Sequence, residues 1–484
     1  MKRSPVARLV VLSASLVLTA IGALNSSIAT RPARASTVHT VTSTADSGPG
    51  SLRDAVAASV FGDSITFNLA LPATISLTSG EINVVSSITV SGPGANLLTV
   101  NGNHISRVFS IALPATVTIT GLTIANGTDA VDNAGGAGIS NFHQLTVSNC
   151  NFTGNQASGD GGGIENNGPI LTVTNCTFSN NSAGTGGGIA SLAGSGSLET
   201  TNCTFNNNTA VFGAGVENIS GIFVATNCTF GSNTATTSGG AIEGEIFGGV
   251  SIANCTMSAN SGGGVVIVGG LIDLQNTIIA DSIGAADCLT GSPLGLNSHN
   301  LIKDGSCSPM LSGNPMLGPL QNNGGPTPTM ALLGGSPAID AGDDSVLGSP
   351  FTLATDQRGA GFPRKAGAHV DIGAFEVQAT IPVGPSFDTC LKDNTSGNLL
   401  QWNRTTGQYQ FFRCSDNFIL TGTGTVALVN GGRTLTDFKS DRRISAGFNT
   451  GQLTGNATIY LMVTQGVWQT FRVIDTNPSA VCKC

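Results

Sequence analysis

Three glutamates recur at one position of a repeated sequence in the middle of the chain. Glu165, Glu217 and Glu243 each follow the apolar residue that ends a glycine cluster. If successive repeats stack about 4.8 Å apart, Glu217 and Glu243 are neighbours, and Glu165 lies two steps from Glu217. Two carboxyl groups at a suitable separation can hydrolyse a glycosidic bond, with one of them acting as a general acid. This column of glutamates raises the hypothesis of a polysaccharide hydrolase.

The rest of the repeat favours a structural role for these acids. Outward carboxylates discourage association through sheet faces and edges, so solvated surface acids are the simpler expectation. Asp160 and Glu245 lie close by in sequence and would add ligands for a cation. Phe212 and Phe247 are the aromatic residues nearest to the column in sequence. Two such side chains offer little surface for stacking on sugar rings.

The distribution of charge excludes other classes of function. No Lys or Arg occurs between Val108 and Ile302, so the central repeats lack the base that a β-eliminating lyase requires. The formal net charge of −8 becomes about −13 if residues 1–35, which contain five basic and no acidic residues, are removed. Such a surface repels nucleic acid and anionic lipid, so we expect neither as a partner.

A second group of acids follows the repeats. Asp residues tolerate turn conformations and cap helices, and we interpret the group in this way. The alternative is a calcium site formed by Asp340, Asp343, Asp344 and Asp371. No other cofactor is indicated. The whole group comprises Asp340, Asp343, Asp344, Asp356 and Asp371, with Arg358 and His369.

The eleven cysteines sort into two classes. Cys288 and Cys307 flank a loop and are expected to form a disulfide in an exported protein. The last domain contains four more, for which three disulfide connectivities are open and a metal site at the Cys-Lys-Cys ending is an alternative: Cys390, Cys414, Cys482 and Cys484. The others recur once per repeat in apolar surroundings, which predicts a ladder of buried thiols: Cys150, Cys176, Cys203, Cys228 and Cys255.

Two motifs that share one period predict the elements that hold these residues. Glycine clusters end at Ile139, Ile164, Ile189, Val216, Ile242 and Val265, at steps of 23 to 27 residues, and an Asn-Cys motif runs in phase with them. A repeat of this length with short strand signals indicates a solenoid. Within one unit, the apolar residues Ile164, Leu171, Val173, Cys176 and Phe178 alternate with polar ones, which gives three short strands per coil.

The corners of each coil are also visible in the repeat. The apolar phase shifts at Asn175, and asparagine tolerates the left-handed backbone that a sharp corner needs. The Asn-Cys-Thr triplets match a glycosylation sequon as well, but their position at the corner favours a structural asparagine ladder. The sequence therefore predicts an all-β protein built on a parallel β-helix.

The N-terminus has the features of an export signal. A basic start precedes an apolar run from about Leu9 to Leu24, and Ala33-Arg34-Ala35 fits a cleavage site. We expect removal of residues 1–35, with an uncleaved N-terminal anchor as the alternative. No second apolar segment of membrane-spanning length follows, so we expect no transmembrane segment in the mature chain.

Two flanking segments resemble parts of known bacterial proteins. VTSTADSGPGSLRDAVAASVFGDSITF, residues 41–67, resembles the CSLREA-type region that opens many exported β-helix proteins. Here Ser51 is expected to N-cap a short helix whose residues Leu52, Val56 and Val60 cover the first coil. NPMLGPLQNNGGPTPTMALLGGSPAIDAGDD (314–344) and TDQRGAGFPRKAGAHVDIGAFE (355–376) are similar to the choice-of-anchor Q region. The resemblance implies a right-handed parallel β-helix and an exported, often surface-associated protein, without implying an activity.

The last hundred residues differ in composition, because they are richer in aromatic side chains and form alternating strand-like runs. They predict a small antiparallel β-sandwich-like domain. The expected organisation is a signal peptide (1–35), an N-terminal cap (36–70), β-helix coils (71–310), C-terminal coils and cap (311–378), a linker (379–386) and a disulfide-bearing β domain (387–484).

The expected function is display, adhesion or ligand binding at the cell surface without catalysis. Glycans or other cell-surface components are the expected partners, and the oligomeric state is open. The alternative is a carbohydrate-active hydrolase that uses Glu165, Glu217 and Glu243.

Overall fold

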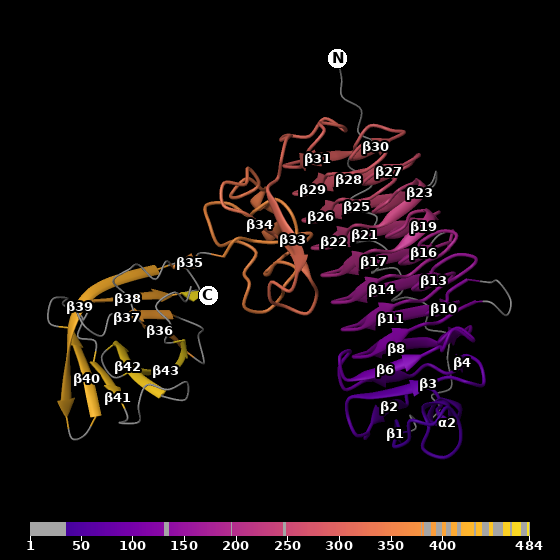
Figure 1. Cartoon of the computed structure of the whole chain (residues 1–484), viewed down its shortest axis with the longest axis horizontal. Helices are drawn as coiled ribbons and strands as arrows, with labels where there is room; N and C mark the ends of the chain where they lie inside the picture. Colours follow the sequence, from indigo (N-terminus) through magenta and orange to yellow (C-terminus); the bar gives the residue numbers. More distant parts are fainter. Residues whose placement is uncertain are drawn as a thin grey trace, which may run out of the picture. The chain divides into compact units, whose positions relative to one another are not determined.

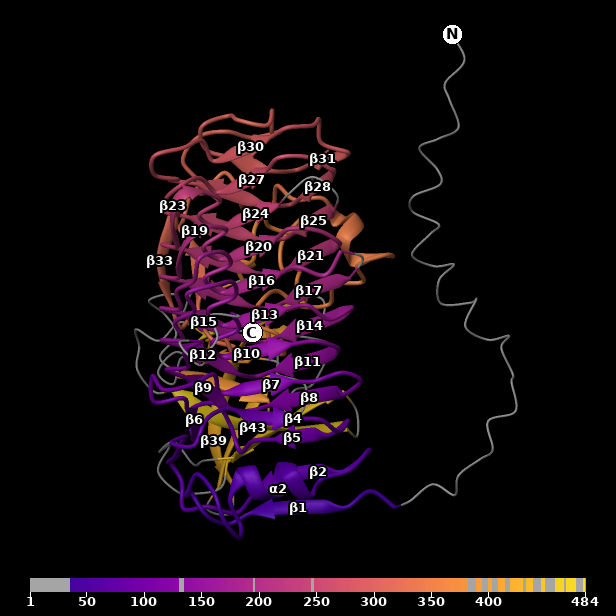
Figure 2. The ribbon, with the colours of Figure 1, turned by 90° about the vertical axis from the view of Figure 1, so that its right-hand side faces the viewer.

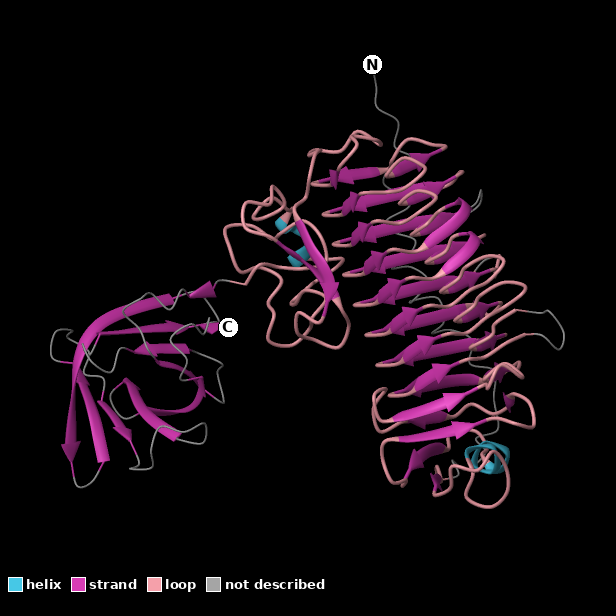
Figure 3. Ribbon diagram, viewed as in Figure 1, coloured by secondary structure: helices cyan, strands magenta, loops and turns pink. Residues whose placement is uncertain are grey.

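The computed structural model describes residues 35–129, 135–194, 196–244 and 248–378, together with the backbone of the strands beyond residue 379. From Val38 onward the chain winds into stacked coils, and three parallel sheets run along the stack (Figures 1 and 3). Each full coil contributes one short strand to each sheet. The fold is the parallel β-helix that the repeat predicts.

Sheet A has eleven strands and runs the whole length of the stack. Its central strands have five residues each, with inward and outward side chains alternating. The strands in order are β1 (Val38–Val41), β2 (Ser64–Phe67), β5 (Thr89–Ser91), β8 (Thr116–Thr120), β11 (Gln144–Ser148), β14 (Ile170–Thr174), β17 (Ser197–Thr201), β21 (Ile222–Thr226), β25 (Gly249–Ala253), β28 (Leu271–Gln275) and β31 (Leu296–Ser298).

Sheet B follows the asparagine corner of each coil and has ten strands. They are β3 (Ala73–Ser76), β6 (Leu98–Asn101), β9 (Thr123–Ala125), β12 (Asn151–Thr153), β15 (Thr177–Ser179), β18 (Thr204–Asn206), β22 (Thr229–Gly231), β26 (Thr256–Ser258), β29 (Ile278–Ala280) and β32 (Leu301–Ile302).

Sheet C carries the glutamate column and has nine strands, stacked beside sheet A in Figure 2. They are β4 (Ile82–Val84), β7 (Phe109–Ile111), β10 (Ile139–Asn141), β13 (Ile164–Asn166), β16 (Ile189–Ser191), β20 (Val216–Asn218), β24 (Ile242–Gly244), β27 (Val265–Ile267) and β30 (Cys288–Thr290). A separate two-stranded ladder, β19 (Thr209–Phe212) with β23 (Thr234–Ser238), lies in the loops between sheets B and C.

The core of the stack is made of identical side chains that repeat from coil to coil. Phe152, Phe178, Phe205 and Phe230 stack with ring centroids 4.5 to 4.8 Å apart, close to the spacing of neighbouring strands. All of them are fully buried, as are Ile164, Leu171, Val173 and Cys176 of one repeat unit. The pairing of Phe152 with Ile124 extends the column upstream.

The corners between sheets A and B use asparagine in every central coil. The backbone φ angle at these residues lies between 48° and 55°, in the left-handed region that asparagine tolerates. The residues are Asn149, Asn175, Asn202, Asn227, Asn254 and Asn276. This confirms the corner that the phase shift at Asn175 predicts.

A second asparagine ladder lies inside the stack, three residues after each core aromatic or methionine side chain. In the first four members, the side-chain amide donates to the amide oxygen of the asparagine on the next coil, at 2.9 to 3.0 Å. All five members are fully buried: Asn155, Asn181, Asn208, Asn233 and Asn260. This ladder was not among the features expected from the sequence, although its fixed distance from the core side chain is a clear signal in every repeat.

The N-terminal end is closed by helix α2 (Leu52–Ala58), the expected short helix. The Ser51 hydroxyl caps it by accepting a 3.1 Å hydrogen bond from the Asp54 amide. Leu52 and Val56 are buried, so they cover the first coil as expected. The expectation was wrong for Val60, which is exposed because it lies beyond the helix.

Residues 314–378, which we call the strap, lie along the side of the stack. They include strands β33 (Leu317–Gln321) and β34 (Thr329–Leu332) and the short 3-10 helix η3 (Asp344–Leu347). Figure 1 shows the strap beside the strands of sheet B, and hydrogen bonds join it to coils between Asn202 and Asn276. We expected C-terminal coils and a cap from this segment, but it covers a side face, because the outward Thr204, Thr229 and Thr256 of β18, β22 and β26 hydrogen-bond to it.

Beyond the strap, the strands form an antiparallel domain, but they are not arranged as the expected sandwich. The expectation was a sandwich, but eight strands pair into a closed barrel, and a short pair, β35 (Thr380–Ile381) with β44 (Cys482–Lys483), accompanies it. The barrel strands are β36 (Thr389–Asp393), β37 (Leu399–Trp402), β38 (Gln408–Arg413), β39 (Phe418–Val429), β40 (Gly432–Asp437), β41 (Ser445–Phe448), β42 (Thr458–Thr464) and β43 (Val467–Asp475).

Candidate functional site

The glutamate column has the register that the repeat predicts. Glu165 pairs with Ala190 on the next coil, Ala190 pairs with Glu217, and Glu217 pairs with Glu243. Glu217 and Glu243 are therefore one coil step apart, and Glu165 is two steps from Glu217. Successive side chains of a strand point to opposite faces of the sheet, and the Ile or Val before each glutamate points into the apolar core. All three glutamate side chains are therefore on the outer face of sheet C.

The expectation that these acids are solvated is wrong. Glu165, Glu217 and Glu243 are only 5%, 1% and 5% exposed. The glycine four residues before each glutamate has a left-handed backbone and lies against that residue. A Cβ atom on Gly213 or Gly239 would approach the side chain of Glu217 or Glu243 to 2.3 or 2.4 Å. The glycine clusters fold back over sheet C and cover the column.

Hydroxyl groups bind two of these carboxyl groups inside the covered layer. The Ser140 hydroxyl donates to Glu165 Oε2 at 2.8 Å, and the Ser238 hydroxyl is 2.8 Å from both oxygens of Glu243. Burial raises the pKa of Glu165, and the nearby Asp160 raises it further. A polymer cannot reach carboxyl groups buried in this way. The arrangement therefore serves packing between the loops and sheet C, and it does not support a hydrolase.

The residues expected beside the column do not form a sugar platform with it. Asp160 accepts a 2.6 Å hydrogen bond from Thr185, which ties two neighbouring loops together. Phe212 lies at the end of β19 and is 37% exposed, whereas the glutamate column is covered. Glu245 and Phe247 lie outside the described residues.

Asp129 is a buried acid that the sequence analysis missed. Its carboxylate accepts hydrogen bonds from the backbone amides of Gly135, Ser158 and Gly159, at 2.7 to 3.1 Å, and from the Ser158 hydroxyl. Burial opposes ionisation, but these donors outweigh it and hold the pKa of Asp129 below its usual value. Asp129 anchors two loops and has no motif of its own that could have revealed it.

The acids of the strap stabilise turns. Asp343 caps η3 by accepting from the Ser345 amide at 2.9 Å, and Asp371 accepts from the amides of Asp340 and Val377. Within the described part of the chain, no group of three or more His, Cys, Asp or Glu side chains is arranged to hold a metal ion.

The strap also contains two buried ion pairs that fix its fold. Arg358 pairs with Asp356 at 2.5 Å, and Arg364 pairs with Glu376 at 2.9 Å. The Arg358 guanidinium also stacks on the ring of Phe375, 3.7 Å from its centroid. These contacts stabilise the fold of the strap itself, and the folded strap packs against sheet B.

The cysteines of the β-helix separate as expected. Cys288 and Cys307 form a disulfide. The five cysteines of the repeat are free and fully buried, and the backbone amides of Cys150, Cys203 and Cys228 each lie 3.4 Å from the thiol of the next coil. The side chains of Cys390, Cys414, Cys482 and Cys484 lie outside the described residues.

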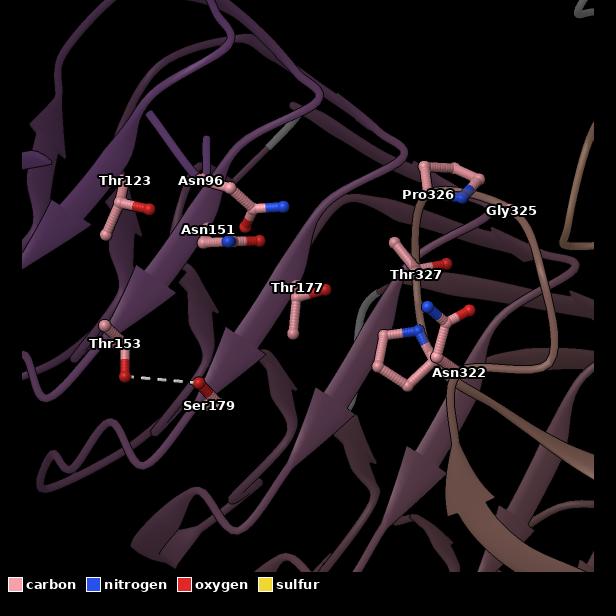
Figure 4. A pocket seen from close by; sticks show the side chains of 11 residues that line it. Asn96, Thr123, Asn151, Thr153, Thr177, Ser179, Asn322, Gly325, Pro326 and Thr327 are labelled. Atoms are coloured by element: carbon pink, nitrogen blue, oxygen red, sulfur yellow. Dashed lines mark hydrogen bonds between the residues drawn. The ribbon is translucent and has the colours of Figure 1, made fainter. Parts of the chain in front are cut away.

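An open groove lies where the strap meets sheet B. Its volume is about 330 Å³. Thr123, Asn151 and Thr177 from neighbouring coils form one wall, and the strap forms the other (Figure 4). The lining residues are Asn96, Thr123, Asn151, Thr153, Thr177, Ser179, Asn322, Gly325, Pro326, Thr327 and Pro328.

The groove offers hydrogen-bonding groups without charge. Its lining contains hydroxyl groups, amides, glycine and proline, and it includes no acidic, basic or aromatic side chain. Ser179 donates to Thr153 at 3.2 Å, so adjacent coils align their hydroxyl groups (Figure 4). Such a surface can recognise a polar, uncharged ligand, but it has no acid or base for catalysis. The groove has no signal in the sequence, because its two walls are far apart in the chain.

Comparisons with protein-family models, with curated proteins and with solved structures find no match for this chain. In the described residues, no helix is long and apolar enough to cross a membrane.

Proposed function

We propose that this chain is an exported, surface-associated protein whose β-helix binds a partner without catalysis and so acts in display or adhesion. The expected export signal in residues 1–35 and the resemblance of residues 314–344 and 355–376 to the choice-of-anchor Q region support the cellular location. The observation that carries the binding role is the groove between sheet B and the strap, which is accessible and lined by uncharged hydrogen-bonding groups.

The burial of the glutamate column argues against the hydrolase alternative. Glycosidase carboxyl groups must contact the scissile bond from opposite sides. Glu217 and Glu243 lie beneath glycine loops and point in the same direction from adjacent strands of one sheet. Neither the position nor the accessibility of these groups suits an attack on a polysaccharide.

The test measures catalysis and adhesion on the same purified chain, beginning at Ser36. Reducing-sugar release is measured on neutral and acidic polysaccharides, with the Glu217→Gln variant as a comparison. We expect no release above background from either protein. Release by the wild type that Glu217→Gln abolishes would establish a hydrolase and overturn the proposal.

Adhesion is measured with beads that carry the purified chain and are mixed with cells of a bacterial panel or with host cells. We expect bead binding that falls when Thr177→Val and Asn151→Leu are combined, because both side chains line the groove. Thr172→Val on the neighbouring sheet A is the matched control, and it should bind as the wild type does. Equal binding by all three proteins would remove the groove from the proposal.

A further inference from the structure

A single column of outward side chains runs along sheet B, and the strap covers part of it. The column occupies the first position of each strand from β9 to β26 and the second position of β6, and its members pair in register from coil to coil. We call it the hydroxyl column, since six of its seven members are threonines. It consists of Thr99, Thr123, Asn151, Thr177, Thr204, Thr229 and Thr256.

The covered half of the hydroxyl column binds polar groups of the strap. Thr204 donates to the Pro328 carbonyl at 2.6 Å, Thr229 donates to Oε1 of Gln357 at 2.5 Å, and Thr256 accepts from the Ala374 amide at 2.9 Å. These three threonines are at most 1% exposed. Two of the three partners are backbone groups, so the column already binds polypeptide within this molecule.

The other half of the column is open to solvent in the groove. Thr123, Asn151 and Thr177 are partly exposed, and Thr177 is the immediate neighbour of the strap-bound Thr204. The Thr327 side chain of the strap donates to the Asn202 carbonyl at 3.0 Å, so the strap segment at Pro326 to Pro328 ends the covered region at this coil. The groove therefore extends the interface with the strap to further members of the hydroxyl column, which carry the same kinds of hydrogen-bonding groups.

The chemistry of the lining favours a peptide over a sugar. Hydroxyl and amide side chains match the N–H and C=O groups of an extended backbone, and Pro326 and Pro328 add apolar contact. The lining has no aromatic ring for stacking on a sugar, and it has no charge to pair with an ionic ligand. The net charge of −8 further disfavours acidic partners.

We propose that the groove binds an extended, uncharged segment of a partner polypeptide, whose backbone groups bond to Asn151 and Thr177 as those of the strap bond to Thr204. This inference rests on the proposed non-catalytic binding function and names its ligand class. The strap supplies the precedent for the bound segment, because its residues Thr327 and Pro328 contact the adjoining coil.

The probe is a fluorescein-labelled peptide with the strap sequence NGGPTPTM, residues 323–330, titrated with the full chain by fluorescence polarisation. We expect saturable binding that Thr177→Val or Asn151→Leu each weakens by about 3- to 10-fold, since each removes one hydrogen bond. Thr172→Val should leave binding unchanged. Pro326→Glu, an exposed change in the other wall, should also weaken binding and guards against a folding defect in the strand variants.

The outcomes separate this inference from the proposed function. No peptide binding, or binding that none of the groove variants alters, overturns the peptide ligand. A neutral oligosaccharide that binds and loses affinity with Thr177→Val also overturns it, while leaving non-catalytic binding at the groove intact. Bead adhesion that persists when no peptide binds also overturns the peptide ligand, while leaving the non-catalytic binding function intact. Circular dichroism and melting curves verify that each variant is folded.

Discussion

The Ser140 hydroxyl and the Glu165 carboxyl group lie on adjacent coils and are joined by a 2.8 Å hydrogen bond. Both side chains are on the outer face of sheet C, yet they are 1% and 5% exposed. The loops that bear Gly136 and Gly161 cover them. The β-helix therefore has an apolar interior and, outside sheet C, a second and polar buried layer.

Glu165 should make the stability of the protein depend on pH. Burial raises its folded-state pKa above the ordinary value of 4.5, which means that folding favours the protonated form. Its contribution is fully present below pH 4.5 and is lost as the pH rises through the raised pKa. We expect the free energy of unfolding of the wild type, relative to Glu165→Gln, to fall as pH increases through this window.

Urea unfolding of the two proteins at a series of pH values from 4 to 8 measures this difference. The Gln side chain still accepts from Ser140 but does not titrate, so other ionisable groups cancel in the comparison. A constant difference across the series would mean that Glu165 has an ordinary pKa and would contradict the prediction.

The glycines that cover the glutamates should resist substitution. Gly213 has a φ angle of +57°, and a Cβ atom there would lie 2.3 Å from Glu217 Oε2. Gly213→Ala should lower the free energy of unfolding by more than about 2 kcal/mol, because it combines left-handed strain with a clash against buried atoms. Gly249→Ala is the control, since a Cβ atom there has no neighbour within 4 Å. Similar melting temperatures for both variants would show that the cover is loose.

The thiol ladder should be chemically silent in the folded protein. Cys150, Cys176, Cys203, Cys228 and Cys255 are fully buried, and a thiol must be exposed and ionised to react. Maleimide labelling followed by peptide mass mapping should find these five cysteines unmodified in buffer and modified in denaturant. If any of these cysteines in the folded protein is labelled as fast as a small free thiol, the prediction of a buried ladder is wrong.

Gln357 should be the main polar link between the strap and the coils. Its amide nitrogen donates to the Cys203 carbonyl at 3.1 Å and to Thr204 at 2.8 Å, and its oxygen accepts from Thr229. Gln357→Leu leaves these buried groups unsatisfied and should cost more than about 3 kcal/mol. Gln321→Ala, at an exposed position of the same strap, should cost little.

Limited proteolysis reports this change directly. The Gln357→Leu variant should be cleaved within residues 314–378 faster than the wild type, while the coils stay intact, because the strap is then less firmly held. Cleavage patterns that match those of Gln321→Ala would show that other contacts, such as Asn276 with Asp343, hold the strap by themselves.

The sequence predicts the coil well because each coil position has one residue type in many repeats. Phe178, Cys176 and Asn175 are found at the same place in their neighbours, so one period reveals the core, the thiol ladder and the corner together. The same reasoning predicts the pairing of Glu217 with Glu243. It was wrong about their exposure, since alternation tells which face of a strand a side chain occupies and does not tell what covers that face.

By itself, the sequence determined the local and periodic features: three strands per coil, the direction of each side chain and the Cys288–Cys307 disulfide. These depend on alternation, on backbone preference and on neighbours within a repeat. Only the tertiary structure decided what lies over sheets B and C. The glycine loops bury Glu165, and the strap covers Thr204 but stops before Thr177, leaving the groove. Contacts between the strap and coils more than a hundred residues away in the chain have no period, so no repeat could reveal them.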